Sequence, residues 1–230
     1  MISVDLHIHS CLSPCGDDNM TPFDLVGMSL LNGVELIALT DHNTAKNCPA
    51  AKAAADAYGI GFIPGLEVTT SEDIHCVCLF PDIDKALAFD KLIEEHLPPI
   101  PNDTAIFGNQ IIMSSDGSTE QFPTLLITGC DISIMDLPAI VKKYDGICYP
   151  AHVDRESNGL LAILGMWPED LDVTAAEVRF ELPDAVPKHL KILQASDAHR
   201  MESLPEGGYP LPLKSADFEG LKDYICGIHI

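Results

Sequence analysis

The chain has 230 residues, a length at which a single domain, including a barrel, is as common as two domains. No apolar run approaches the roughly 18 residues that a membrane-spanning helix needs, so we expect no membrane partner. The formal net charge of −22 repels polyanions, so we expect no long nucleic acid as a partner.

The first segment of the chain has the alternation of a strand. Val4, Leu6 and Ile8 fall on one face, and the histidines His7 and His9 fall on the other. The N-terminus carries no basic segment and no long apolar stretch, so we expect no export signal and a cytoplasmic location.

The following segments alternate between helix and strand patterns. Thr21 and Pro22 predict the start of a helix, and Asn32 with Gly33 predicts its end. Further strands are predicted at 35–40, from 61–63, and at 74–80, 147–150, 175–180 and 191–195, with helices at 45–58, 84–97, 133–144 and 160–166. About seven short strands, mostly separated by helices, predict a parallel sheet that closes or nearly closes into a barrel. We expect one domain over residues 1–230.

Residues 98–128 interrupt this alternation. A proline-rich stretch leads into Ile111–Met113, a Ser115-Asp116-Gly117 turn and a second extended run, which together predict a hairpin insertion. The sequence is compatible both with a lid and with a simple cover over one end of the barrel.

Potential metal ligands follow several of the predicted strands. The pair His7 and His9 could converge on one ion, although taken alone it is equally well explained as polar strand residues facing solvent. Further candidates come directly after later strands: His42, Glu67, His152, Asp197 and His199. Because parallel strands bring their C-terminal ends to one mouth of a barrel, this repeated pattern favours a shared metal site.

The remaining histidines fit the pattern less well. His96, His189 and His229 are expected to be surface residues, and His75 could be either a ligand or a core histidine.

In order and spacing these motifs resemble the polymerase and histidinol phosphatase (PHP) family of metal-dependent phosphoesterases. The opening motif is Asp5–Ser10, the second is Thr40–Asn43, and the last is Asp197-Ala198-His199, with Glu67, His75 and His152 between them. The resemblance spans nearly the whole chain and implies a distorted seven-stranded (β/α)7 barrel with two or three divalent metal ions.

The resemblance also implies a ligand set, position by position. His7, His9, Glu67 and Asp197 would hold one metal, Glu67 would bridge to a second metal held also by His75 and His152, and His42 and His199 would bind a third. For the remaining ligand of the third metal the family uses a histidine or an aspartate. Asp17 and Asp18 are adjacent here, and Asp17 is chosen.

Other residues near the motifs are candidates for catalysis. Imidazole and carboxylate ligands suit zinc, manganese or iron, and Asp41 is expected to orient a histidine or a metal-bound water. Arg155 and Arg200 each lie beside a metal motif and could bind phosphate, whereas a salt bridge is an equally good explanation for either, in the case of Arg155 with Asp154 or Glu156.

Three functions compete. The preferred one is hydrolysis of a small phosphorylated molecule by a metal-activated water, with a nucleotide, a sugar phosphate or a compound like histidinol phosphate as substrate. The alternatives are a nuclease acting on short oligonucleotides and a metal-bound regulatory module without turnover. The sequence leaves the leaving group and the oligomeric state open.

Overall fold

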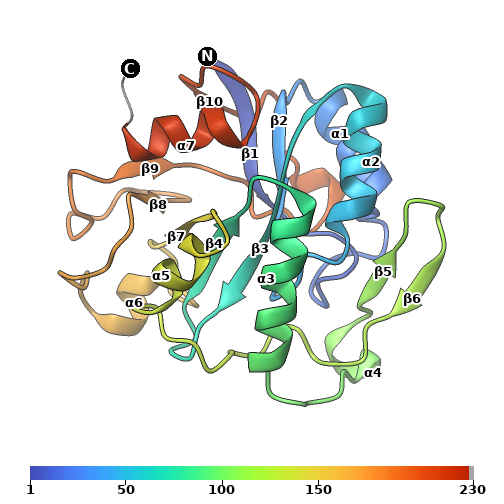
Figure 1. The fold of residues 1–230 in the computed structure, drawn as a ribbon, viewed down its shortest axis with the longest axis horizontal. Helices are drawn as coiled ribbons and strands as arrows, with labels where there is room; N and C mark the ends of the chain where they lie inside the picture. Colours follow the sequence, from blue (N-terminus) through green and yellow to red (C-terminus); the bar gives the residue numbers. More distant parts are fainter. Residues whose placement is uncertain (228–230) are drawn as a thin grey trace.

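A six-stranded sheet forms the centre of the molecule in the computed structural model, which describes residues 1–227. In spatial order the strands are β10 (Tyr209–Leu211), β1 (Ile2–Ile8), β2 (Leu36–Leu39), β3 (Gly61–Thr69), β4 (His75–Leu79) and β7 (Ile147–Pro150) (Figure 1). The strands β1, β2 and β3 run parallel, whereas the β10–β1, β3–β4 and β4–β7 pairs are antiparallel. A separate parallel pair consists of β8 (Ala175–Glu177) and β9 (Lys191–Leu193).

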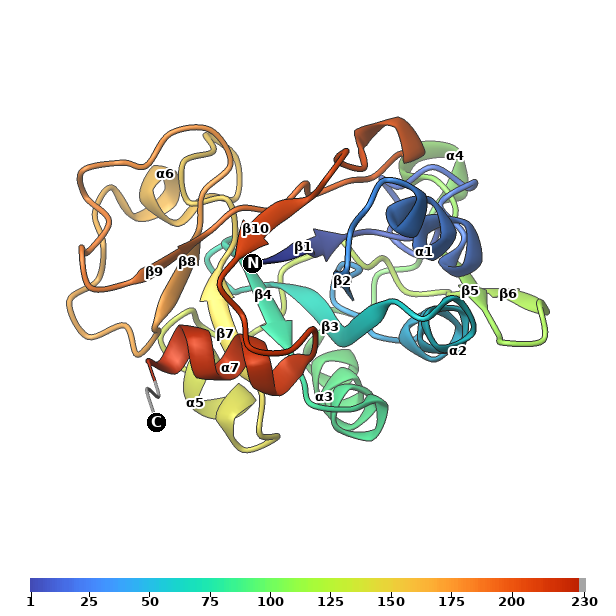
Figure 2. The same ribbon diagram turned by 90° about the horizontal axis from the view of Figure 1, so that it is seen from above.

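Helices surround this sheet (Figures 1 and 2). The longer ones are α1 (Pro22–Leu31), α2 (Cys48–Tyr58), α3 (Ile83–His96) and α7 (Phe218–Cys226), and the short ones are α4 (Thr104–Phe107), α5 (Leu137–Lys142), α6 (Leu160–Leu164) and the 3-10 turn η1 (Met201–Ser203). Within residues 1–227, no helix combines the length and the apolarity needed to cross a membrane.

Local sequence signals account for where several helices begin. The side chain of Thr21 accepts a hydrogen bond of 3.1 Å from the backbone N–H of Asp24, and Pro22 opens α1, as predicted. The carboxylates of Asp82 and Asp217 cap α3 and α7 in the same way. These caps satisfy backbone donors that a helix leaves free at its first turn.

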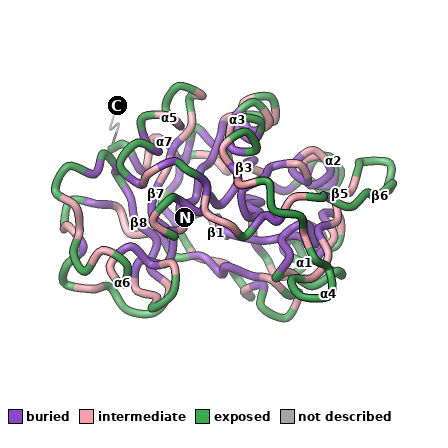
Figure 3. The backbone as a smooth tube through the Cα atoms, turned by 90° about the horizontal axis from the view of Figure 1, so that it is seen from below, coloured by how far each residue is buried: buried purple, intermediate pink, exposed green. Residues whose placement is uncertain are grey.

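Most strand residues of the central sheet are buried and appear purple in Figure 3, and two hydrophobic cores contain them. Neighbouring residues of β2 belong to opposite cores: Ile37 and Leu39 pack in the larger core with α1 and α2, whereas Leu36 and Ala38 pack in a second core. Helix α7 closes this second core. A sheet covered on both faces explains the nearly continuous apolar runs of its strands.

The structure confirms the α/β class, but the predicted seven-stranded (β/α)7 barrel is not confirmed, since the sheet has six strands and is open. The main departure is at β4, which runs antiparallel to both of its neighbours. Only residues 70–74 separate β3 from β4, and so short a connection cannot hold the crossover helix that parallel strands need. This hairpin was missed because Pro64 and Gly65 are unfavourable inside a strand, whereas β3 continues through both residues as far as Thr69.

The insertion at 98–128 contains the predicted hairpin, formed by β5 (Ile111–Met113) and β6 (Thr119–Gln121). The hairpin projects beside α2 in Figures 1 and 2. Its first strand is tied to the rest of the molecule, because the N–H of Ile111 donates to the carbonyl of Cys11 and the N–H of Met113 donates to the side chain of Asn47. The insertion therefore packs against the loop that follows β1 and is hydrogen-bonded to it.

Candidate functional site

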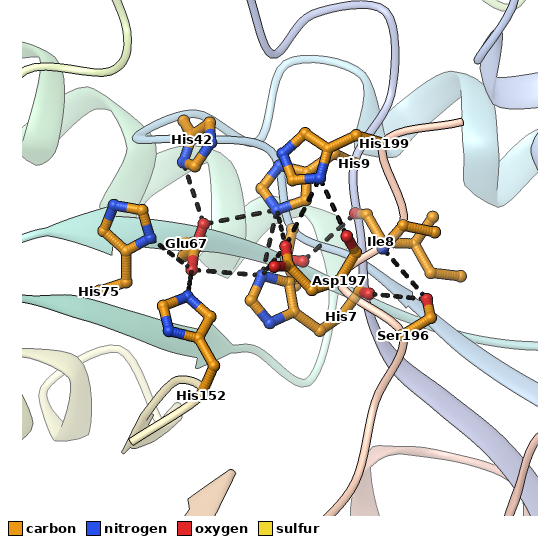
Figure 4. Close-up of polar contacts among 12 residues, drawn as sticks. His7, Ile8, His9, His42, Glu67, His75, His152, Ser196, Asp197 and His199 are labelled. Atoms are coloured by element: carbon orange, nitrogen blue, oxygen red, sulfur yellow. Dashed lines mark hydrogen bonds and ion pairs between the residues drawn. The ribbon is translucent and has the colours of Figure 1, made fainter. Parts of the chain in front are cut away.

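The carboxylate of Glu67 lies at the centre of a cluster of histidines (Figure 4). Glu67 is fully buried, and its side chain is held on β3 near the end of that strand. Its Oε1 atom lies 2.9 Å from His75 Nδ1, 3.2 Å from His152 Nε2 and 3.3 Å from His7 Nε2, and its Oε2 atom lies 3.0 Å from His42 Nδ1 and 3.4 Å from His9 Nε2. Five imidazoles from four segments of the chain thus meet one carboxylate.

A second carboxylate, Asp197, connects this cluster to two arginines. Its Oδ1 atom lies 3.3 Å from His9 Nε2 and 3.5 Å from His7 Nε2, while its Oδ2 atom lies 2.7 Å from Arg155 and 3.2 Å from Arg179. The backbone of Asp197 has φ 50°, a left-handed conformation that is unfavourable for a residue with a side chain. Strained backbone conformations of this kind cluster at functional sites, where the direction of a side chain is important.

The strand arrangement explains why residues so far apart in sequence meet. His7 and Glu67 lie on parallel strands, and the segment after β2 that carries His42 forms a bridge with Glu67. His75 is the first residue of β4, and it pairs with Thr69 at the end of β3. Because β4 runs antiparallel, its beginning reaches the edge where the parallel strands end, which places His75 among the other histidines.

Buried hydrogen bonds fix the orientation of the first two histidines. The Nδ1 atom of His7 lies 3.0 Å from Glu177 and that of His9 lies 2.9 Å from the hydroxyl of Ser13. Ser13 in turn donates to Asp41 over 2.8 Å. With Nδ1 used in this way, each ring turns Nε2 toward the centre, where the two Nε2 atoms are only 3.1 Å apart.

Several buried polar atoms around Glu67 make no hydrogen bond of good geometry among the described residues, although His42 Nδ1 and His75 Nδ1 lie 3.0 Å and 2.9 Å from its oxygens. They are His42 Nδ1, Glu67 Oε2, His75 Nδ1 and His152 Nδ1. Three overlapping groups of side chains could hold a cation there: His7, His9, Glu67 and Asp197; His42, Glu67 and His75; and His9, His42 and His199. Unpaired donors and acceptors that converge from all sides fit divalent ions, and imidazole with carboxylate suits zinc, manganese or iron.

The protonation states of the side chains in the cluster differ. Burial by itself would raise the pKa of Glu67, but His75 and His7 hold this pKa well below its ordinary range. Asp197 behaves likewise, since His7 and His9 lower a pKa that burial would raise. Burial and the neighbouring His9 lower the pKa of His199 to about 2. The carboxylates are therefore ionised and His199 is neutral, which are the forms that bind metals. Burial lowers the pKa of His7, His9 and His42, but carboxylates such as Glu67 outweigh it and raise these pKa values, that of His42 to about 9, so a metal that binds there must displace protons.

A cavity of about 650 Å³ opens above the cluster. Its wall includes His42, His75, Asp197 and His199 together with Arg155, Arg179 and Phe180. This volume is in the range of pockets that bind small organic ligands. The cavity thus joins a strongly polar floor to a mouth that carries two guanidinium groups and an exposed aromatic ring.

The structure brings together eight of the nine predicted metal ligands and leaves one outside. The side chain of Asp17 is exposed and accepts a hydrogen bond from the N–H of Asn19, and Asp18 pairs with Asn109. Neither carboxylate belongs to a group that could hold a metal. The chosen ligand Asp17 is thus not where the prediction needed it, because the loop turns its side chain toward solvent.

The predicted catalytic residues divide in the same way. Arg155 lines the cavity and pairs with Asp197, not with Asp154 or Glu156. Arg200 is exposed and does not line the cavity, so its selection for phosphate binding is not supported by its position. Asp41 is buried behind the cluster, where it contacts Ser10 and Ser13, and it can act on His9 only through Ser13.

The histidines expected at the surface are also placed. His189 is exposed, whereas His96 is partly buried and pairs with Asp131. His229 lies outside the described residues.

Sequence reasoning missed several residues that the structure places at the site, among them Cys15 and Phe180 in the cavity wall. Glu177, which orients His7, ends β8, and the rule that selected carboxylates at strand ends could have found it. Arg179 follows two residues later and had no motif beside it. Ser13 carries no sequence signal, since its role depends on the fold of a loop.

The model of the PHP domain family matches residues 5–135, more than half of the chain. The chain belongs to the PHP domain family. The match includes the positions of His7, His9, His42, Glu67 and His75. It ends before His152 and Asp197, so a single domain over residues 1–230 stays a prediction.

Relatives of this PHP chain have names from different branches of phosphoester chemistry. A 3',5'-nucleoside bisphosphate phosphatase of Chromobacterium violaceum is 38% identical over 77 residues, which cover 34% of this chain and 26% of the relative. A 5'-3' exoribonuclease of Haemophilus influenzae is 38% identical over 78 residues, covering 33% of this chain and 27% of the relative. The matched stretch therefore spans only about a quarter of each of these two relatives.

The fold is similar to that of a lesion-specific endonuclease, EndoQ from Pyrococcus furiosus. The TM-score is 0.67 at 17% identity, and the similarity covers 99% of this chain and 56% of the endonuclease. At this level of identity the likeness concerns the fold alone.

These comparisons correct the expectation about nucleic acids. The acidic charge was taken to exclude long nucleic acid, yet a related fold, Endonuclease Q, has been solved with a 27-mer duplex at its active site. A net charge sums the whole surface, whereas binding responds to the field inside a cleft, where Arg155 and Arg179 lie. Charge therefore gives no ground for excluding such a partner here.

Proposed function

We propose that this PHP chain hydrolyses phosphate esters with the help of divalent metal ions, and that its substrate is a small phosphate monoester. The observation that carries this proposal is the buried Glu67 carboxylate, which faces five imidazoles. Its Oε2 atom makes no hydrogen bond of good geometry, and a cavity with two arginines lies above it. A donor set of this kind gains nothing as a purely structural element, because an apolar core would be more stable than so many buried polar groups.

Two or three ions would be held by the residues that converge on Glu67. We assign His7, His9, Glu67 and Asp197 to one ion, and Glu67, His75 and His152 to a second, with His42 and His199 available to a third. When bound, such ions lower the pKa of water and neutralise charge on phosphate oxygens. Glu177 and Ser13 would keep His7 and His9 in the tautomers that present Nε2 to an ion.

The two arginines would bind the phosphate group. Arg155 and Arg179 both line the cavity, and Asp197 holds one nitrogen of each at its Oδ2 atom. Their remaining N–H donors can point into the cavity, because the side chains are 35% and 32% exposed. Paired guanidinium groups suit the two negative charges of a terminal phosphate better than the single charge of an internal diester.

A nuclease is the second candidate, and one observation favours it. Phe180 lines the cavity, is 75% exposed and lies next to the Arg179 guanidinium, 5.6 Å from its ring centroid. An exposed ring beside a cation is a platform on which a nucleobase can stack. A nucleotide substrate would use the same platform, so the ring favours a nucleoside moiety over a sugar phosphate.

Hydrolysis assays of the metal-loaded protein would test this proposal. The substrates are an aryl phosphate monoester, the matching diester, a nucleoside monophosphate and a single-stranded oligonucleotide of at least twenty nucleotides. We expect turnover of the monoesters. Turnover confined to the diester or the oligonucleotide would replace our proposal with the nuclease, and no turnover of any substrate by a metal-loaded protein would favour a regulatory module.

A further inference from the structure

A cysteine occupies the side of the cluster where sequence comparison led us to expect a carboxylate. The Sγ atom of Cys15 lies 3.2 Å from His42 Nε2, and both residues line the cavity together with His199. Asp17 and Asp18, the expected candidates, turn away from this point. Cys15 is therefore the nearest potential ligand to His42 from this loop.

Backbone contacts hold the loop that carries Cys15. The N–H of Gly16 donates to the carbonyl of Ser13, and the N–H of Asp17 donates to the carbonyl of His199 over 2.9 Å. A side chain at Gly16 would not fit, because its Cβ would lie 2.6 Å from the carbonyl oxygen of Ser10. The thiol is thus held against His42 by a tightly packed turn that is also tied to the backbone of His199.

The histidines at this point offer donors for a cation independently of the thiol. His9, His42 and His199 have ligand atoms within 4.8 Å of one another. The side chain of His42 is only 6% exposed, and its Nδ1 atom faces Glu67 Oε2 at 3.0 Å, so its Nε2 atom is the one that faces Cys15. His199 donates from Nδ1 to the carbonyl of Asp197, which leaves the lone pair of Nε2 free. These features indicate a cation site with or without Cys15.

We propose that Cys15 is a thiolate ligand of the cation held by His42 and His199. This inference rests on the proposed metal centre but not on the proposed reaction. Its consequence is a difference between neighbouring metal positions: sulfur is a soft ligand that favours zinc, whereas the positions around Glu67 have only imidazole and carboxylate ligands. The competing explanation is that the thiol only donates a hydrogen bond to His42, which the 3.2 Å distance also allows.

Cobalt substitution distinguishes the two explanations. The protein would be loaded with Co²⁺, and its near-ultraviolet absorption would be read for thiolate-to-cobalt charge transfer, a signal that is independent of turnover. We expect the band in the wild type and in C226S, a control that removes the other exposed cysteine, and no band in C15S. The variant C15H replaces the thiol with an imidazole that can also bind cobalt. It should therefore bind as much cobalt as the wild type but lack the thiolate band.

Zinc affinity gives the second readout. We expect C15S to bind one zinc equivalent at least about tenfold more weakly than the wild type, with the other equivalents unchanged. Zinc should also protect Cys15 from alkylation by iodoacetamide while leaving Cys226 reactive, as measured by mass spectrometry of tryptic peptides.

The outcomes separate failure of this inference from failure of the metal centre. Cobalt bound at full occupancy without a thiolate band in the wild type, or a band that persists in C15S, overturns the role of Cys15 alone. A protein that binds no cobalt overturns this inference together with the metal centre.

Discussion

The floor and the mouth of the cavity are built on different principles. The floor consists of side chains around Glu67 that are almost fully buried and are held by strands and by hydrogen bonds behind them. The mouth consists of Arg155, Arg179 and Phe180, which are about one-third or more exposed and come from loops. We infer that the floor determines which reaction the site can perform, whereas the mouth determines which phosphate ester reaches it.

The largest effect should follow from changing the floor at its centre. Glu67→Gln keeps the size of the side chain but removes the charge that the five histidines surround, so metal content should fall. We expect activity to fall by more than about 100-fold, beyond the ~10–100-fold typical of residues that only support a ligand. Elemental analysis and turnover of an aryl phosphate would measure both effects. Glu94→Gln, an exposed glutamate on α3, is the matched control and should leave both unchanged.

Changing the mouth should affect turnover without affecting metal content. We expect Arg155→Ala and Arg179→Ala each to lower kcat/KM by about 100-fold, as when one preorganised donor to a developing charge is lost. Arg200→Ala is the control, because Arg200 is exposed and does not line the cavity. If the arginine variants lost their metals instead, the separation of floor from mouth would be wrong. Asp197 would then need the two arginines to hold its carboxylate in the position that binds metal.

Support behind the floor should matter less than the floor itself. Glu177→Gln weakens the hydrogen bond that orients His7, so metal affinity should fall by about 10–100-fold while saturating metal restores most of the activity. Titration with a metal chelator would measure the affinity. Glu181→Gln, an exposed neighbour, should behave as the wild type. An activity loss that excess metal does not restore would instead assign Glu177 to the reaction.

The smallest effect on turnover is expected for Asp5→Asn, which should instead change the free energy of unfolding. Asp5 is fully buried and accepts hydrogen bonds from the backbone and the hydroxyl of Ser196, and burial raises its pKa from 3.8 to about 6. Because the folded protein binds this proton more tightly than the unfolded chain, the contribution is present below pH 4 and is lost as the pH rises through 6.

Urea unfolding of the metal-free protein would show this contribution as a difference between variants. The free energy of unfolding of the wild type minus that of Asp5→Asn should fall by about 2 kcal/mol between pH 4 and pH 6. A difference that stays constant over this range would show that Asp5 is ionised throughout it.

The floor was predictable from the sequence to a much greater degree than the mouth. Ligands such as His42 and His152 lie within three residues of the end of an apolar strand, and the parallel strands of one sheet bring these ends to one edge. Only the family resemblance indicated that His75 is a ligand. Its strand β4 is antiparallel to β3, so His75 lies at the beginning of a strand, whereas the other ligands were expected at strand ends. The barrel prediction failed at the same strand.

The residues that sequence reasoning missed or misplaced come from loops and strand ends. Arg179 reaches the cavity while Arg200, which directly follows a ligand, does not, and no local pattern distinguishes the two. In the loop after β1, Asp17 turns to solvent and Cys15 turns to His42 because backbone hydrogen bonds set the direction of each residue. Such directions depend on tertiary contacts, which composition and spacing do not encode.

Anomalous diffraction from crystals grown with zinc or manganese would test most directly whether Glu67 is the centre of a metal cluster. We predict separate peaks on the two sides of its carboxylate, one within bonding distance of His7, His9 and Asp197 and the other next to His75 and His152. Crystals of an active, metal-supplemented protein that show no peak within bonding distance of Glu67 would contradict the account.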